Sequence, residues 1–143
     1  MDSWLIFALL SAVFAALVSI FAKVGLQGVD ANTATTVRAF IMFLFLIGVI
    51  LIQGKFDNIF VFFLDKKILL FIILSGIAGA LSWLFYFIAI KKGTVTKVVS
   101  IDRLSIVFAM VFAFVFLNEK VTIKSILGVL LIAVGAIIIA IDN

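Results

Sequence analysis

The sequence contains no cysteine, histidine or proline, and only seven of its 143 residues are aspartate or glutamate. Without cysteine and histidine, the chain has no thiol nucleophile, disulfide, imidazole base or soft-metal ligand of the usual kind. Seven scattered carboxylates do not indicate a cage for a hard metal ion, and no nucleophile is paired with a base. The sequence therefore predicts no metal site, no cofactor and no enzymatic activity.

Apolar residues, in contrast, make up 67% of the chain, charged residues make up 13%, and the mean hydropathy is +1.49. Soluble domains are about half apolar, so this composition indicates an integral membrane protein. The net charge of +4 fits loops that face anionic lipid headgroups better than nucleic-acid binding, which needs a clustered basic face. We expect a multi-pass protein of the cytoplasmic membrane that contacts lipids and has no nucleic-acid partner.

Five apolar runs are long enough to cross a hydrocarbon core about 30 Å thick, which takes about 20 helical residues. They cover residues 4–22, 33–52, 68–90, 98–117 and 123–141. The longest connection contains the phenylalanine-rich stretch 56–65, which is too short to span and fits an interfacial amphipathic turn. The pattern predicts an all-α membrane protein with one domain, residues 1–143, and five transmembrane helices.

The fourth apolar run carries two charges, Asp102 and Arg103. A charge near the bilayer centre costs about 2.5 to 3.5 kcal/mol, and such residues usually mark a substrate or ion pathway. Lys97 lies about one turn before Asp102, and Ser105 continues the same helix face. We interpret these four residues as part of a pathway.

Arg38 lies about two turns into the second run, where it either snorkels to the interface or serves a function. Counted at about 1.5 Å per residue from the same side of the membrane, Arg38 and Asp102 lie at a similar depth of about 7 to 9 Å. We therefore predict that they form an interhelical charge cluster with Arg103 at one end of a cavity. The alternative is a buried pair that only fixes the helix register.

Small and aromatic residues share one face of the third run. Trp83, Tyr86 and Phe87 indicate either tight packing of large rings or an aromatic-lined cavity, and we place Trp83 and Tyr86 in the pathway. Glycines at helical spacing favour close contacts between membrane helices. The glycines expected at helix-packing or dimer contacts are Gly76, Gly79, Gly128 and Gly135.

The basic residues are divided almost evenly between the two sides of the membrane. The side with the N-terminus has five lysines: Lys55, Lys66, Lys67, Lys120 and Lys124. The other side has four, or six if Arg38 and Arg103 are included; the four are Lys23, Lys91, Lys92 and Lys97. Because an excess of Lys and Arg normally sets orientation, this near tie suggests that the chain inserts both ways up and pairs with itself antiparallel. Many transporters are built from such inverted repeats.

Several segments together form a pattern found in a known family: residues 12–16 and 22–26, Arg38, residues 75–93, and Phe116-Leu117-Asn118-Glu119-Lys120 followed by Gly128 and Gly135. They resemble a single EamA domain of the drug/metabolite transporter superfamily. The stretch Lys97-Val98-Val99-Ser100-Ile101-Asp102-Arg103-Leu104-Ser105 is similar to Lys-Val-Ala-Pro-Ile-Asp-Lys-Leu-Ser in short, single-domain members from bacteria and archaea. Two departures are Ser100, which replaces a proline that would kink the helix, and Asn118, which replaces a glycine at a helix end.

The resemblance implies a fold and a function. Most EamA proteins have two such domains in tandem, ten helices with inverted halves, and export or exchange small metabolites. This chain would then be a five-helix half that works as a homodimer. The first run lacks the carboxylate of the similar small multidrug-resistance proteins, which disfavours a drug/proton exchanger of that type.

Three functions remain open. The first is a secondary transporter that moves a small metabolite by alternating access, with Asp102 as the proton or cation site, or with Arg103 and Arg38 binding a substrate carboxylate or phosphate. The second is a lipid-handling, flippase-type or accessory membrane subunit whose basic cluster binds an anionic headgroup. The third is a purely structural membrane subunit.

Overall fold

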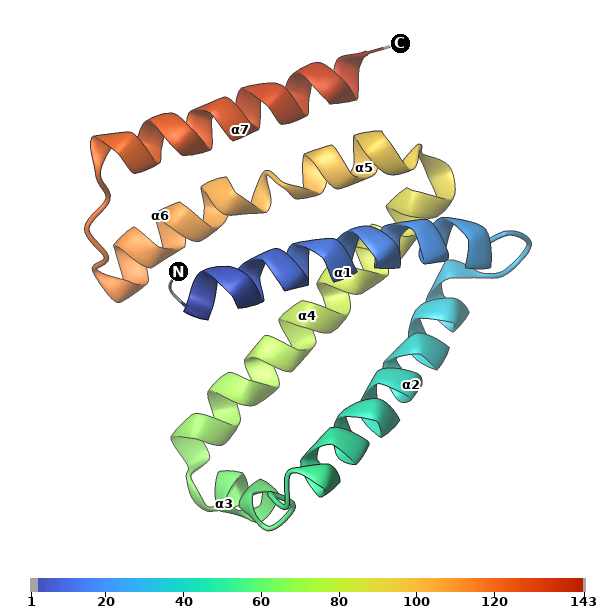
Figure 1. Ribbon diagram of the computed structural model, residues 1–143, viewed down its shortest axis with the longest axis vertical. Helices are drawn as coiled ribbons and strands as arrows, with labels where there is room; N and C mark the ends of the chain where they lie inside the picture. Colours follow the sequence, from blue (N-terminus) through green and yellow to red (C-terminus); the bar gives the residue numbers. More distant parts are fainter. Residues whose placement is uncertain (1–2, 143) are drawn as a thin grey trace. The chain divides into compact units, whose positions relative to one another are not determined.

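The computed structural model describes residues 3–142, except for the side chains of Val61 and Phe62, and in this part of the chain it is helical without strands. Its helices are α1 (Ser3–Gly25), α2 (Ala31–Ile52), α3 (Asn58–Leu64), α4 (Lys66–Lys92), α5 (Val95–Asp102), α6 (Ser105–Leu117) and α7 (Ile123–Ile141) (Figure 1).

Among the described residues, five helical segments are long and apolar enough to cross a membrane. They are α1, α2, α4, α7 and the pair α5–α6, which together cover Val95–Leu117. Large apolar side chains cover their outer surfaces, as expected where the surrounding solvent is hydrocarbon. The prediction of an all-α membrane protein with five spans is confirmed, while the antiparallel dimer stays a prediction.

The helices divide into two compact units. One unit contains α1, α5, α6 and α7, and the other runs from Gly25 to Lys91 and contains α2, α3 and α4. The expected single domain over residues 1–143 therefore stays a prediction.

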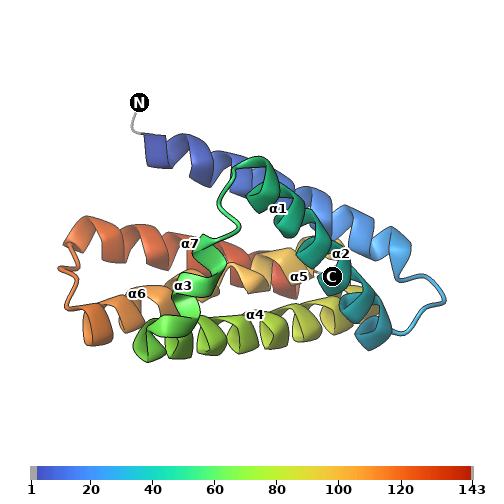
Figure 2. The ribbon, with the colours of Figure 1, turned by 90° about the horizontal axis from the view of Figure 1, so that it is seen from below.

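In the first unit, α7 lies antiparallel beside both α5 and α6 (Figure 1 and Figure 2). The face of α7 that carries Val129 and Ala136 is buried. Thr122 caps the start of α7, because its hydroxyl accepts a hydrogen bond of 3.2 Å from the Ser125 N–H. At the other end of α7, the Lys97 ammonium donates to the Asp142 carbonyl and ties α5 to it.

Another lysine contact in this unit joins residues far apart in the sequence. The Lys23 ammonium, at the end of α1, donates a hydrogen bond of 2.8 Å to the Gly93 carbonyl in the turn before α5. Helix ends and turns leave carbonyls without helical partners, and a lysine ammonium satisfies them well. Lys23 therefore fixes this turn against the end of α1.

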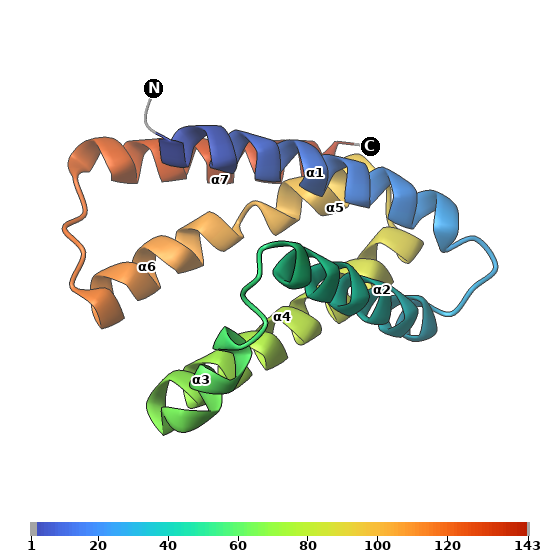
Figure 3. The same ribbon diagram turned by 60° about the horizontal axis from the view of Figure 1, so that its bottom comes forward.

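The second unit is a hairpin of α2 and α4, joined by α3 (Figure 3). Asp30 caps α2 by accepting from the Thr33 N–H at 2.9 Å and from the Thr33 hydroxyl at 3.1 Å. The Thr33 N–H is the main reason why the pKa of Asp30 falls below its ordinary value of 3.8, and the positive charge of Lys91 acts in the same direction. The Lys91 ammonium donates to the Val29 carbonyl at 2.7 Å, so the end of α4 is tied to the turn before α2.

The phenylalanine-rich connection is a short helix rather than a turn. Asp65 ends α3 and caps α4, since its carboxylate accepts from the Lys67 N–H at 2.9 Å. Phe60 and Phe63 of α3 are 61% and 63% exposed. Their exposure is compatible with the expected position in the headgroup boundary.

Candidate functional site

The fourth span is interrupted in the middle. α5 ends at Asp102 and α6 begins at Ser105, and the backbone between them changes from i+4 to i+3 hydrogen bonding. The Leu104 N–H donates to the Ile101 carbonyl at 2.9 Å, and the Ile106 N–H donates to the Arg103 carbonyl at 3.2 Å. The break therefore lies at Arg103–Leu104, between two half-helices.

The residues of α5 explain a break without proline. The Ser100 hydroxyl donates a hydrogen bond of 2.8 Å to the Thr96 carbonyl, one turn earlier. Such a bond weakens and often bends a helix, because the hydroxyl shares a carbonyl that the backbone N–H uses. Five of the eight residues of α5 are also β-branched, which lowers helix propensity.

The break brings together three of the predicted pathway residues: Asp102, Arg103 and Ser105. All three side chains are exposed at the surface of the chain. Non-helical backbone and charge at membrane depth are tolerated where they line a water-filled cavity or are covered by protein. The geometry of this span thus requires water or another protein surface at the break. Lys97 differs from these three, because its ammonium is engaged with the Asp142 carbonyl.

A second cluster lies in the hairpin of α2 and α4. The guanidinium carbon of Arg38 lies 3.6 Å from the centroid of the Trp83 ring and 5.2 Å from that of Phe87. This is the geometry of a cation–π stack, with Trp the strongest partner among the aromatic rings. Arg38 and Trp83 are half-buried, and Phe87 is buried.

The aromatic residues of α4 support one another around this stack. The Trp83 centroid lies 5.6 Å from that of Tyr86 and 5.9 Å from that of Phe87. The Trp83–Tyr86 pair is edge-to-face, an arrangement that the ring quadrupoles favour. Of the predicted site residues, the structure thus brings together Arg38, Trp83 and Tyr86 and adds Phe87. Phe87 lies four residues after Trp83, and this spacing indicates that the two rings are neighbours on one helix face.

The two residues of the predicted charge cluster, Arg38 and Asp102, belong to different units. Arg38 belongs to the hairpin of α2 and α4, and Asp102 belongs to the unit of α1, α5, α6 and α7. Their pairing stays a prediction. Within the hairpin, the partner found for Arg38 is aromatic.

Of the four glycines expected at contacts, Gly76 and Gly128 are exposed, and Gly79 and Gly135 are partly exposed. Gly76 and Gly79 are on α4, and Gly128 and Gly135 are on α7. A Cβ added at any of them would meet nothing within 4 Å in the part of the chain that the structure describes. Their role as helix-packing or dimer contacts stays a prediction. Residues 3–142 also show no group of three or more His, Cys, Asp or Glu side chains that could hold a metal ion.

The family model described as the EamA-like transporter family matches residues 2–141. The chain belongs to this family. It is 38% identical over 140 residues to a protein of Sinorhizobium sp. named as an uncharacterized transporter in the cobO 3′ region, and the match covers 98% of each chain. It is also 29% identical over 146 residues to an uncharacterized protein of Methanocaldococcus jannaschii, over the full length of both. No solved structure matches the chain.

This EamA protein is a multi-pass membrane transporter of the drug/metabolite transporter superfamily. Its two departures from the short members now have a structural account. The helix break three residues after Ser100 forms without a proline, and Asn118 occupies a left-handed position, with φ of 53°. Asn is the residue other than glycine that most readily takes this position at a helix end.

Proposed function

We propose that the chain is one half of a secondary transporter, which works as an antiparallel dimer and moves a small metabolite by alternating access across the cytoplasmic membrane. The observation that carries this proposal is the break at Arg103–Leu104, with Asp102 exposed beside it. Transporters of this kind bind their substrates near the bilayer midplane, at helices interrupted in this way. A second inverted copy would supply the protein surface that the break requires.

In this mechanism, Asp102 and Arg103 belong to the pathway, and Asp102 is the proton or cation site. The two half-helices α5 and α6 can tilt separately about the break, which supplies a hinge within the membrane. The continuous helix α7 packs against both halves and limits that motion. Coupling to protons would follow if Asp102 binds and releases one during each cycle.

Transport is tested in proteoliposomes loaded with an isotope-labelled extract of small metabolites, with efflux followed by mass spectrometry. The wild-type protein should release at least one metabolite faster than empty liposomes, and Asp102→Asn should abolish the release. Asp57→Asn is the matched control, because Asp57 lies before α3 and outside the spans. Equal release from the wild-type protein and Asp102→Asn would contradict the role of Asp102.

The antiparallel arrangement has a separate test, which uses the absence of cysteine. A cysteine is introduced at Asn143, which lies outside the described residues, and intact cells are labelled with a membrane-impermeant thiol reagent. Labelling of about half the chains would support insertion in both orientations. Labelling near zero or near completion would mean a single orientation and would exclude the antiparallel homodimer.

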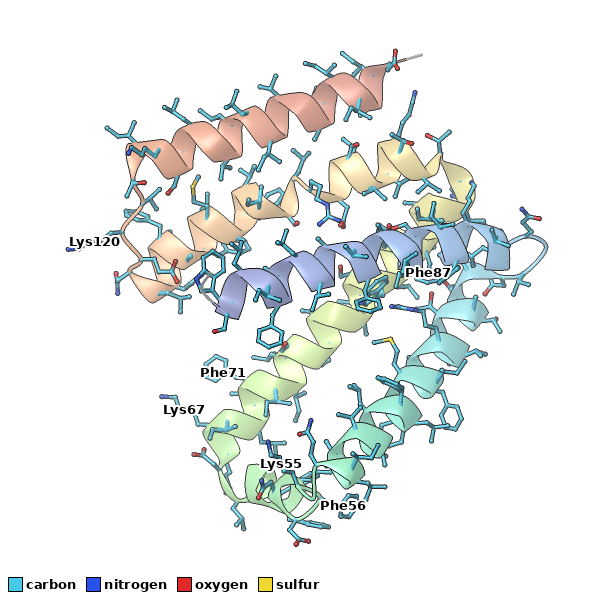
Figure 4. All side chains as sticks on the ribbon, viewed as in Figure 1. Lys55, Phe56, Lys67, Phe71, Phe87 and Lys120 are labelled. Carbon is cyan, nitrogen blue, oxygen red and sulfur yellow. The ribbon has the colours of Figure 1, made fainter. Side chains whose placement is uncertain are left out.

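A lipid-handling function is the second candidate. It is favoured by a depression along one face of α4 that is lined by Lys67, Ile68, Phe71, Ile72 and Ser75. Lys67 and Phe71 lie in the half of α4 near α3 (Figure 4). An ammonium at the end of an apolar depression suits an anionic headgroup and its acyl chain. Lipid that co-purifies with the wild-type protein and is lost in Lys67→Gln would support this function.

A further inference from the structure

The Arg38 guanidinium is held on an aromatic platform inside the second span. Its carbon lies 3.6 Å above the Trp83 ring, and Phe87 flanks it at 5.2 Å. Arg38 is seven residues from the start of α2 at Ala31, which places its backbone about 10 Å along the helix. Trp83 is nine residues from the end of α4 at Lys92, about 14 Å along that helix. The stack thus holds the charge within the span.

The hydrogen-bond donors of Arg38 are not satisfied within the hairpin. A guanidinium carries five N–H donors in its plane, and a stack on a ring uses the face of the group and not these edges. Within the described part of Gly25–Lys91, Arg38 has ring contacts but no hydrogen bond or ion pair. Unpaired donors are expensive in a membrane, so the edge of the guanidinium requires an acceptor.

The hairpin has no carboxylate available to be that acceptor. Its acidic residues are Asp30, Asp57 and Asp65. Asp30 accepts from the Thr33 N–H and hydroxyl. Asp57 and Asp65 flank α3, at the opposite end of α2 from Arg38. The hairpin therefore presents a fixed positive charge without an anion of its own.

We propose that Arg38, held on Trp83, binds the carboxylate or phosphate group of the transported substrate. An oxyanion of either kind accepts two parallel N–H bonds from the guanidinium fork, and the Trp83 ring fixes the plane in which that fork lies. This inference rests on the proposed transport function and names the chemical class of its substrate. It needs only residues of the hairpin, so each copy in a dimer would carry one anion site.

Binding can be measured without transport, because Trp83 is one of only two tryptophans. Trp4→Phe leaves Trp83 as the sole tryptophan, and this protein is placed in phosphatidylcholine nanodiscs. Acetate and inorganic phosphate are titrated separately, with chloride adjusted to keep the ionic strength constant. We expect a saturable change in Trp83 emission with at least one of them, since an anion at the guanidinium edge alters the field across the ring.

Variants in the same background locate the site. Arg38→Gln should weaken the binding about 10- to 100-fold, the scale of hydrogen bonds between a cation and an oxyanion. Arg38→Lys keeps the charge but loses the fork, and it should weaken binding by a smaller factor. Lys55→Gln, in the exposed connection between α2 and α3, is the matched control and should bind like the parent protein. Circular dichroism identifies any variant that fails to fold, and Arg38→Lys then carries the test.

Two results would overturn the inference. One is found in the titrations: either Trp83 emission shows no saturable change, or Arg38→Gln and Arg38→Lys bind the anions as tightly as the parent protein does. The other is found in nanodiscs that contain phosphatidylglycerol: if the lipid alone produces the bound emission and blocks both anions, the occupant is a headgroup and not a transported substrate. Metabolite efflux is measured on the same variants, so efflux without anion binding would contradict this inference and leave the transport function standing. Anion binding without efflux would contradict the transport function, and only the anion site at Arg38 would stand.

Discussion

The stack of Arg38 on Trp83 predicts a measurable coupling between the two side chains. Cation–π pairs contribute about 0.5 to 1 kcal/mol at exposed sites and about 2 kcal/mol when desolvated. Arg38 is half-buried, lies 3.6 Å from the Trp83 centroid and has Phe87 as a second ring at 5.2 Å. These features place the expected coupling at about 1 to 2 kcal/mol, a factor of about 5 to 30 in the folding equilibrium.

A double-mutant cycle of Arg38→Met and Trp83→Leu isolates this term. The unfolding free energy of each variant is measured by circular dichroism in mixed detergent and SDS micelles. Trp83→Leu alone should cost more than Arg38→Met alone. It also removes ring pairs with Tyr86 and Phe87, each worth about 0.5 to 1.5 kcal/mol.

The control cycle combines Trp83→Leu with Lys55→Met. Lys55 lies near α3, whereas Phe87 lies toward the opposite end of α4 (Figure 4). The two control substitutions should be additive within about 0.3 to 0.5 kcal/mol. If the Arg38–Trp83 coupling is no larger than this control value, the stack does not stabilise the hairpin.

Three further outcomes follow from local geometry. Ser100→Ala removes the hydrogen bond to the Thr96 carbonyl, which we hold responsible for the helix break. Hydrogen exchange of the Leu104 amide should therefore slow about 3- to 10-fold. An unchanged exchange rate would mean that this bond does not cause the break. Asn118→Val should lower the unfolding free energy by about 1 to 2 kcal/mol, because valine is strained in the left-handed backbone conformation of this position. Asn118→Gly should be about as stable as the parent protein. Equal stability of the Val and Gly variants would argue against a left-handed backbone at residue 118. The lowered pKa of Asp30 means that its carboxylate stabilises the fold above pH 3.8 and that this contribution is lost as the pH falls through the folded-state pKa. Asp30→Asn keeps a capping side chain without a titrating group, so the unfolding free energy should lose the pH dependence that Asp30 contributes. If the variant and the parent protein show the same acid dependence, Asp30 makes no such contribution.

The spans were predictable because membrane thickness sets their length. Each of the five apolar runs lies inside an observed helical segment. The helix α3 was expected only as an interfacial turn, since seven residues carry too little periodicity to distinguish a helix from a turn.

The partners of individual charges were less accessible to sequence reasoning. Similar depth in the membrane suggested Asp102 as the charge partner of Arg38, but depth alone does not say which helices are neighbours. The Trp83 ring is the partner found within the hairpin, because α4 returns beside α2. Similarly, the bond from Lys97 to the Asp142 carbonyl depends on where α7 ends relative to α5, which no local pattern encodes. The break after Ser100 had local signals, a serine among β-branched residues, but the sequence lacks proline, the usual signal of a kink.

The contact of α7 with both α5 and α6 has a consequence for biosynthesis. The fourth span leaves the ribosome with an interrupted backbone and two charges, before the helix that packs along it exists. At about 5 to 20 residues per second, the segment from Leu117 to Ile141 takes about 1 to 5 s to appear. During that interval α5 and α6 lack the helix that packs along both of them. Helix α7 thus secures a span that is made before it.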